Sequence, residues 1–333
     1  MIRSRLVGAA LLLFLAATAR PAAAQVPDAA TLLTDIGFSA DQIAKIKAGS
    51  IIHGDIKAST ERELVVAFAF QVKPSPTDLV NQLRKGLMDR TDSNTIAFQL
   101  IQGAPTVDAF AKLTFGPNAA KQAGAYLSAA PGTDLNLSSA EIGTFTALGR
   151  GAQPAAVEQA VRSALLARLQ AYQTKGLAGI APYARSDGQR SVGDELRSAT
   201  KATKRLQSLV PHAYQFLLDY PAGRPQGTDE TFRWTYFNAH DVPTIALTQG
   251  LAMPDGDAWI VSQRQFYVST GYNCEQAIAA FLPMQGGTLV VYSNRTSTDQ
   301  VMGWGGGMKR DIGSKLLASQ LEDLFGKIQG GAK

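Results

Sequence analysis

Apolar and polar positions alternate through the second half of the chain, a pattern typical of strands with one buried face. Phe232, Trp234 and Tyr236 alternate with threonine and arginine, which places three aromatic side chains on one face of a sheet. Turn residues at 254–257 and two glycines at 286–287 separate apolar runs and predict two antiparallel hairpins. We therefore expect strands at 244–253, 258–268, 276–282 and 288–292.

The chain ends in apolar residues at helical spacing, which predict a long amphipathic C-terminal helix. Charged residues such as Lys315 and Asp323 occupy the opposite positions. The apolar stripe has to be buried, and the nearest apolar surface is the predicted sheet that precedes it. The members of the stripe are Ile312, Leu316, Leu317, Leu321, Leu324, Phe325 and Ile328.

The first part of the chain mixes helices and strands. A capping-box pattern from Ser39 to Gln42 begins a helix within a helical segment at 25–50. Residues 116–229 are predominantly helical and end in a linker rich in proline and glycine. Before them we expect a helix at 77–88 and strands at 51–57, 64–72, 95–100 and 107–115.

These elements predict an α+β protein with a curved antiparallel sheet packed on the long C-terminal helix. Residues 51–115 and 230–330 would form the main domain. Residues 116–229 would form a mainly helical insertion, either a lid or a satellite subdomain.

The order of elements is similar to that of START-like helix-grip proteins: a strand and helix at 64–88, antiparallel strands, a glycine-rich turn and a long last helix. That family has no short motif, so the resemblance rests on element order over 64–115 and 230–328. It implies a curved sheet that wraps the last helix and encloses an apolar cavity for lipids, sterols or other hydrophobic molecules.

Three stretches, 264–269, 293–299 and 305–310, also resemble a group of uncharacterised secreted bacterial proteins. This resemblance spans most of the chain after residue 24. It implies no particular activity.

The N-terminus has the order of a secretory signal peptide, with Arg3 and Arg5, an uncharged apolar run, and small residues that end at Ala24. A membrane anchor is the alternative, but the apolar run is shorter than the roughly 20 residues that cross a bilayer. We therefore expect cleavage near Ala24 and a periplasmic or secreted protein without a transmembrane segment. Peripheral contact with the cell envelope stays open.

Charge and cysteine content change this picture little. The formal net charge of +5 includes three arginines of the predicted signal, which leaves +2, so we expect no nucleic-acid partner. The single cysteine, Cys274, cannot form an intramolecular disulfide. Stability must then come from the apolar core.

Candidate catalytic groups are few. His53, His212 and His240 stand at no metal-ligand spacing from one another or from Cys274, so we expect no metal site. His240 with Asp241 is either a surface turn or an acid–base pair, and Cys274 is either a small residue at a strand start or a nucleophile with His240 as base. The chain has no hydrolase elbow and no phosphate-binding loop, and we expect no cofactor.

Two polar segments near the C-terminus offer further contacts. The glycines around Trp304 either reverse the chain between strand and helix or bring backbone amides to an anionic group. Arg295 either orients the head group of a ligand or forms an ion pair with Asp299.

The function that these patterns favour is non-enzymatic binding of a hydrophobic, lipid-like small molecule between the sheet and the C-terminal helix. Two other functions stay open: a periplasmic hydrolase whose acid and base only the fold brings together, and a cell-envelope scaffold or assembly factor. The expected ligand contacts are Tyr236, Arg264, Tyr267, Tyr292, Arg295 and Trp304.

Overall fold

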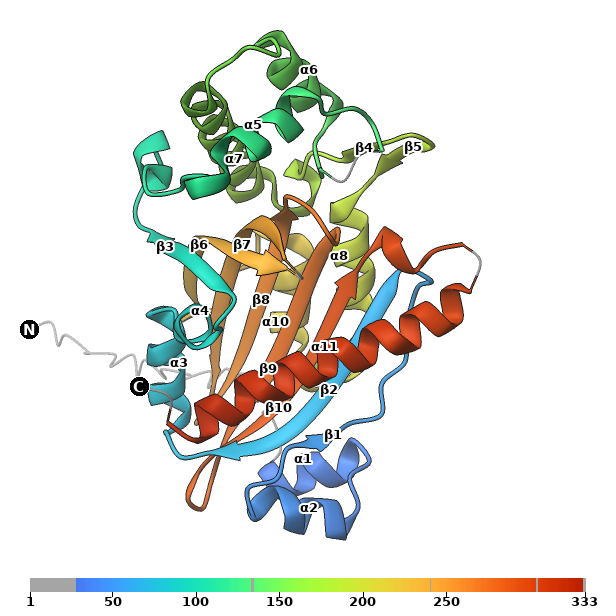
Figure 1. Ribbon diagram of the computed structural model, residues 1–333. Helices are drawn as coiled ribbons and strands as arrows, with labels where there is room; N and C mark the ends of the chain where they lie inside the picture. Colours follow the sequence, from blue (N-terminus) through green and yellow to red (C-terminus); the bar gives the residue numbers. More distant parts are fainter. Residues whose placement is uncertain (1–27, 133–134, 240, 304, 332–333) are drawn as a thin grey trace, which may run out of the picture.

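The computed structural model describes residues 28–132, 135–239, 241–303 and 305–331. The protein is α+β, with a large curved antiparallel sheet, a long C-terminal helix and a mainly helical insertion (Figure 1). Its eight-stranded sheet has the order β1-β2-β10-β9-β8-β7-β6-β3. The predicted fold class is therefore confirmed, whereas the predicted signal peptide at 1–24 lies outside the described residues.

Five consecutive strands form an antiparallel meander at the centre of the sheet, and β2 (Glu63–Val72) and β3 (Thr95–Ile101) join its two sides. Both predicted hairpins are confirmed by the pairs β7–β8 and β9–β10. The meander consists of β6 (Asp229–Ala239), β7 (Val242–Asp255), β8 (Ala258–Val268), β9 (Cys274–Met284) and β10 (Gly287–Ser297).

Three helices cover one face of the sheet, which we call the front face: α3 (Pro76–Arg84), α4 (Leu87–Thr91) and α11 (Gly306–Gln329). Figure 1 shows α11 crossing this face on the diagonal. The helix predicted at 77–88 is in fact two helices. Gly86 separates them in a left-handed conformation (φ 79°), where a Cβ atom would stand 2.5 Å from the Phe98 ring.

Only part of the predicted apolar stripe of α11 faces the sheet. Leu317, Leu321, Phe325 and Ile328 pack in the front core. By contrast, Ile312 and Leu316 are about half exposed, and Met308, one turn before Ile312, is 72 % exposed. The first half of the helix thus carries a second apolar stripe, spaced four residues apart, on its outer side (Met308, Ile312 and Leu316).

The helical insertion lies between β3 and β6 (residues 102–228), and its helices cover much of the other, back face (Figure 1). Phe232, Trp234 and Tyr236 are all buried in the core on this side, as their alternation predicted. The insertion contains α5 (Ala119–Leu127), α6 (Ser139–Ala147), α7 (Pro154–Lys175), α8 (Val192–Lys201), α9 (Lys204–Leu209), α10 (Pro211–Asp219) and the hairpin of β4 (Tyr183–Arg185) and β5 (Gly188–Arg190).

The strand predicted at 107–115 is wrong. Residues Val107–Phe110 form a 3-10 turn, and irregular chain follows them. Phe110, Leu113 and Phe115 are nevertheless buried in the core of the insertion. The Leu113 amide donates to the Phe110 carbonyl oxygen (2.9 Å), and this turn brings both side chains into the core without a strand.

The N-terminal helices α1 (Ala29–Asp35) and α2 (Ala40–Lys47) pack on the back face at one end of the sheet. The Ser39 capping box is confirmed, because the Ser39 hydroxyl accepts from the Gln42 amide and the Gln42 side chain accepts from the Ser39 amide. Of the strand predicted at 51–57, only β1 (Ile52–His53) pairs with β2.

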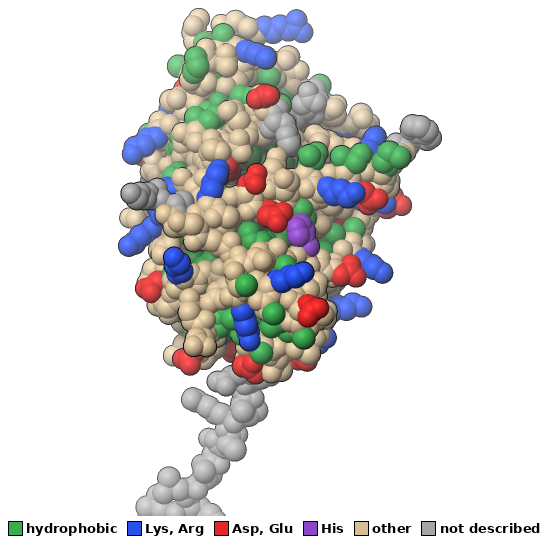
Figure 2. Space-filling view, turned by 60° about the horizontal axis from the view of Figure 1, so that its bottom comes forward, with side chains coloured by type: hydrophobic (Ala, Val, Ile, Leu, Met, Phe, Trp, Pro, Cys, Tyr) green, Lys and Arg blue, Asp and Glu red, His purple; other side chains and the backbone are tan. Residues whose placement is uncertain are grey.

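Figure 2 views the molecule with its bottom turned forward, and lysine and arginine side chains lie there among aspartate and glutamate without a field of one sign. In the described part of the chain, no helix combines the length and the apolar character that crossing a bilayer requires.

Candidate functional site

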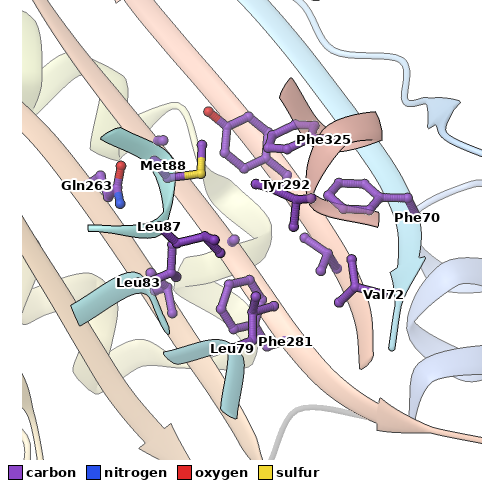
Figure 3. A pocket seen from close by; sticks show the side chains of 15 residues that line it. Phe70, Val72, Leu79, Leu83, Leu87, Met88, Gln263, Phe281, Tyr292 and Phe325 are labelled. Atoms are coloured by element: carbon purple, nitrogen blue, oxygen red, sulfur yellow. The ribbon is translucent and has the colours of Figure 1, made fainter. Parts of the chain in front are cut away.

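An apolar hollow lies on the front face, between the sheet and the helices α3, α4 and α11 (Figure 3). It contains about 520 Å³ of empty space. This volume is an upper bound on the room for a ligand, because it includes space that opens to solvent. The lining residues are Phe70, Val72, Leu79, Leu83, Leu87, Met88, Val261, Gln263, Ala277, Ala279, Phe281, Val290, Tyr292, Phe325 and Ile328.

Helices α3 and α4 form one wall of the hollow. Ser75 caps α3 by accepting from the Asp78 amide, and Pro76 occupies the first turn, so the helix begins at a defined residue. Leu79 and Leu83 are four residues apart and therefore point to the same side, into the hollow (Figure 3). The turn at Gly86 then directs Leu87 and Met88 to the same space.

Helix α11 forms the opposite wall through Phe325 and Ile328. The Phe325 ring lies 4.7 Å from the Phe70 ring and 4.9 Å from the Tyr292 ring, centroid to centroid. Such stacked and edge-on aromatic contacts add to the stabilisation that burial provides. Phe325 therefore anchors the second half of α11 to β2 and β10.

The front face changes from apolar to polar along the strands that form the floor of the hollow. Phe281 and Val290 are directly paired neighbours at the apolar end. Further along the same two strands, Asn294 pairs with Ala277, and Thr296 pairs with Glu275. The front face therefore has an apolar part, which forms the floor of the hollow, and a polar end two to three residue pairs further along, whose polar side chains do not line the hollow.

Hydrogen bonds connect the side chains at the polar end. Asn294 donates from Nδ2 to the Tyr292 hydroxyl (3.1 Å), and its Oδ1 accepts from Thr296 (2.9 Å). Thr296 lies 3.4 Å from Glu275. Burial raises the pKa of Glu275, while hydrogen bonds from Asn294 and Thr296 and the charge of Arg233 act in the lowering direction.

Gln263 carries the one amide side chain among the lining residues. Its Oε1 accepts from Arg233 Nη2 (3.3 Å), and Arg233 Nε lies 2.9 Å from Asp89 Oδ2. This fixes the Gln263 oxygen on Arg233, and no residue of the described ranges accepts from the Gln263 amide nitrogen. A ligand oxygen could accept a hydrogen bond there.

The predicted ligand contacts lie in different parts of the molecule. Tyr292 lines the hollow. Tyr236, Arg264 and Tyr267 lie on the back face, among residues that contact the insertion. Trp304 lies outside the described residues.

Arg264 and Tyr267 are occupied by internal partners. Arg264 is fully buried and donates to Gln276 Oε1 (2.7 Å), Thr200 Oγ1 (3.0 Å) and the Leu217 carbonyl oxygen (2.6 Å). The Tyr267 ring packs under the Arg168 guanidinium at 4.3 Å, and burial raises the pKa of its hydroxyl.

Arg295 does not pair with Asp299. The predicted ion pair between these two residues is therefore wrong. Arg295 Nη1 lies 2.8 Å from Glu63 Oε2, and both side chains are buried. Arg295 also does not line the hollow, because it and Tyr292 are an odd number of residues apart on β10 and point to opposite faces. Asp299 instead follows the strand and pairs with three other arginines.

The candidate catalytic residues form no site in the described residues. His53 pairs with Glu322 at 3.4 Å, whereas His240 lies outside the described ranges. Burial and the neighbouring Glu195 carboxylate raise the pKa of the Cys274 thiol well above its ordinary value, which disfavours a nucleophilic thiolate. No three His, Cys, Asp or Glu side chains gather around a metal-sized space in these ranges.

Sequence reasoning missed most of the lining. The spacing of Leu79, Leu83 and Leu87 predicted a helix but not that its apolar side would meet an incompletely filled space. Gln263 carried a usable signal, since it is a polar residue two positions after Val261 on the same strand face. On this strand face, Gln263 is the position at which the side chains change from apolar (Trp259, Val261) to polar.

No protein-family model matches the chain, and no curated protein or solved structure matches it either. The geometry of the hollow is therefore the basis for a functional proposal.

Proposed function

We propose that the protein binds a hydrophobic small molecule, lipid-like in character, in the hollow between the front face and the helices α3, α4 and α11. The observation that carries this proposal is the lining itself. Its side chains are apolar apart from Gln263 and the Tyr292 hydroxyl. An apolar guest in such a hollow removes the apolar lining from water and supplies close contacts to it.

The architecture supports the proposal at a coarser level. A large antiparallel sheet with a long C-terminal helix across one face is compatible with a helix-grip fold, in which sheet and helix enclose a ligand. Under this proposal the protein is a carrier or receptor that acts outside the cytoplasm, after cleavage near Ala24.

The polar end limits the kind of ligand. The Arg233 charge at this end is balanced by Asp89. An anionic head group would therefore find no unpaired cation among the described residues of this part of the face. We therefore propose a mostly apolar ligand with a neutral oxygen at one end, which can accept from the Gln263 amide.

The test is native mass spectrometry of protein purified from its own compartment, followed by solvent extraction and identification of bound lipids. The proposal expects a bound mass that organic solvent removes. Absence of any bound molecule, together with no rise in melting temperature for any lipid added back, would contradict it.

Ala279→Phe makes the test specific. Ala279 is buried on the floor of the hollow, so a phenyl ring there takes the space of the ligand. Ile96→Phe is the matched control, because Ile96 is 52 % exposed on β3 and lies outside the lining. We expect loss of bound lipid in Ala279→Phe and not in Ile96→Phe. Leu83→Trp, on the wall that α3 forms, replaces Ala279→Phe if that variant does not fold.

A further inference from the structure

Three arginines converge on one aspartate beyond the end of β10. Asp299 Oδ1 lies 2.9 Å from both Arg62 Nε and Arg190 Nε, and Asp299 Oδ2 lies 3.0 Å from Arg185 Nε. The four side chains are 13 % to 32 % exposed, so the group is neither free in solvent nor sealed from it. We call these four residues the arginine cluster.

The members of the arginine cluster come from separate parts of the chain. Arg62 precedes β2, Arg185 and Arg190 stand on the β4–β5 hairpin of the insertion, and Asp299 follows β10. Figure 1 shows this hairpin next to the insertion helices, beyond the end of the sheet. One ion pair would be enough to hold the insertion against the sheet. A purely structural role therefore does not explain three arginines on a single carboxylate.

Charge in the arginine cluster is not balanced by the carboxyl groups of the described residues. Three guanidinium groups face the single carboxylate of Asp299. Within the described ranges, the second carboxyl group that lies within 4 Å of these guanidinium groups is that of Glu195, 3.9 Å from Arg190 Nε. Burial raises the pKa of Glu195 and Asp299 adds to this, although Arg190 acts in the opposite direction. Partly buried like charges repel strongly unless an opposite charge joins them.

Two of the three guanidinium groups keep free donors. All three nitrogens of Arg185 are engaged, with Asp299, Ala184, Asn136 and Asn273. Arg62 and Arg190, in contrast, contact Asp299 through Nε, and no described residue accepts from their terminal Nη atoms. A guanidinium presents its remaining N–H groups as a planar fork that fits phosphate oxygens.

We propose that the arginine cluster binds an anionic phosphate group. Arg62 and Arg190 donate to its oxygens through their Nη atoms, Arg185 adds positive charge, and Asp299 holds the three guanidinium groups side by side. This site is separate from the apolar hollow and does not depend on the function proposed for it.

The phosphate can belong to a soluble molecule or to a lipid head group. A further basic residue lies beside the arginine cluster, because Arg310 of α11 donates to the carbonyl oxygen of Glu61, next to Arg62. Basic residues beside exposed apolar side chains suit a membrane surface. The outer stripe of Met308, Ile312 and Leu316 begins on the same helical turn as Arg310. The experiment therefore needs one arm for each source.

The first arm measures binding of inorganic phosphate to the full chain by calorimetry, in sodium chloride of matched ionic strength. We expect saturable binding in the wild type, weakened about tenfold or more in Arg62→Gln and in Arg190→Gln, because each loses charge-assisted hydrogen bonds. Arg224→Gln is the control: Arg224 is a surface arginine paired with Glu230, and its variant should bind like the wild type.

The second arm measures co-sedimentation with vesicles of phosphatidylcholine, with and without phosphatidic acid. Binding of phosphate in solution assigns a soluble source. Binding only to vesicles that contain phosphatidic acid, again lost in Arg190→Gln, assigns a lipid head group.

Two outcomes would overturn the proposal. One is a wild type that responds neither to phosphate nor to phosphatidic acid beyond the chloride control. The other is binding that Arg62→Gln and Arg190→Gln retain in full. Melting temperatures without phosphate report any structural role of the two arginines separately, so a folding defect is not mistaken for lost binding.

Discussion

Arg264 of β8 donates from Nη2 to the carbonyl oxygen of Leu217, 2.6 Å away, and so joins the sheet to helix α10 of the insertion. The same guanidinium reaches Gln276 on the neighbouring strand and Thr200 on α8. All three acceptors are neutral oxygen atoms. One planar group thus connects one strand of the sheet to three other elements inside the back core.

We expect Arg264→Lys to lower the free energy of unfolding by about 2–4 kcal/mol, because one ammonium group cannot reach three acceptors and leaves buried oxygens unsatisfied. Urea unfolding followed by circular dichroism measures the change. Arg224→Lys, at a pair whose arginine side chain is 45 % exposed, should shift stability by about 0.5 kcal/mol or less. Equal unfolding midpoints for Arg264→Lys and wild type would show that the joint contributes nothing.

Phe325 and Leu316 offer a test of how α11 is held. Phe325 is 4 % exposed among three aromatic rings, whereas Leu316 is 54 % exposed on the outer side of the same helix. Phe325→Ala should cost about 3–5 kcal/mol and Leu316→Ala about 0.5 kcal/mol or less. Amide hydrogen exchange along α11 should also become faster in Phe325→Ala and not in Leu316→Ala. Similar losses of unfolding free energy in the two variants would contradict this packing.

Glu275 makes stability depend on pH in a defined direction. Its pKa is raised in the folded protein, so the folded state holds this proton more tightly than the unfolded chain. The stabilisation of the folded state by this proton is present in full below the ordinary pKa of 4.5. It is lost as the pH rises through the pKa that Glu275 has in the folded protein. We expect Glu275→Gln, which stays neutral, to match the wild type below pH 4.5 and to be more stable above it.

Asp299 supplies the opposite sign as a control for this measurement. The Arg185, Arg190 and Arg62 guanidinium groups hold the pKa of Asp299 below its ordinary value of 3.8, although burial acts in the raising direction. Its contribution is present above pH 3.8 and is lost as pH falls through the folded value. Asp299→Asn should therefore lose stability near neutral pH. If the urea midpoints of Glu275→Gln and Asp299→Asn move in the same direction near neutral pH, the opposite signs given to the two carboxyl groups are wrong.

Local patterns predicted the elements well where one short-range cause decides them. Phe232, Trp234 and Tyr236 share a face because a strand has a period of two, and no distant contact alters that. The Ser39 capping box is equally local. The segment 107–115 misleads because its apolar residues alternate only loosely, and Val107–Phe110 form a 3-10 turn that pairs with no strand of the described residues.

The candidate site was harder to predict because its position depends on contacts between distant segments. Alternation already separates Tyr292 from Arg295 on β10. Which of those two faces keeps an apolar hollow is decided by how α3, α4 and α11 pack on one side and the insertion on the other. Arg264 and Tyr267 looked like ligand contacts, yet the insertion supplies their partners from residues far away in the sequence.

The insertion leaves the sheet after β3 and re-enters it at β6, and these two strands are antiparallel neighbours. A tight turn could therefore replace residues 102–228 without changing how any strand is connected to its neighbour in the sheet. Yet the removed segment contributes much of the second layer, and Trp234, now fully buried, would meet water. The segment is dispensable to the topology and indispensable to the solubility of the folded sheet.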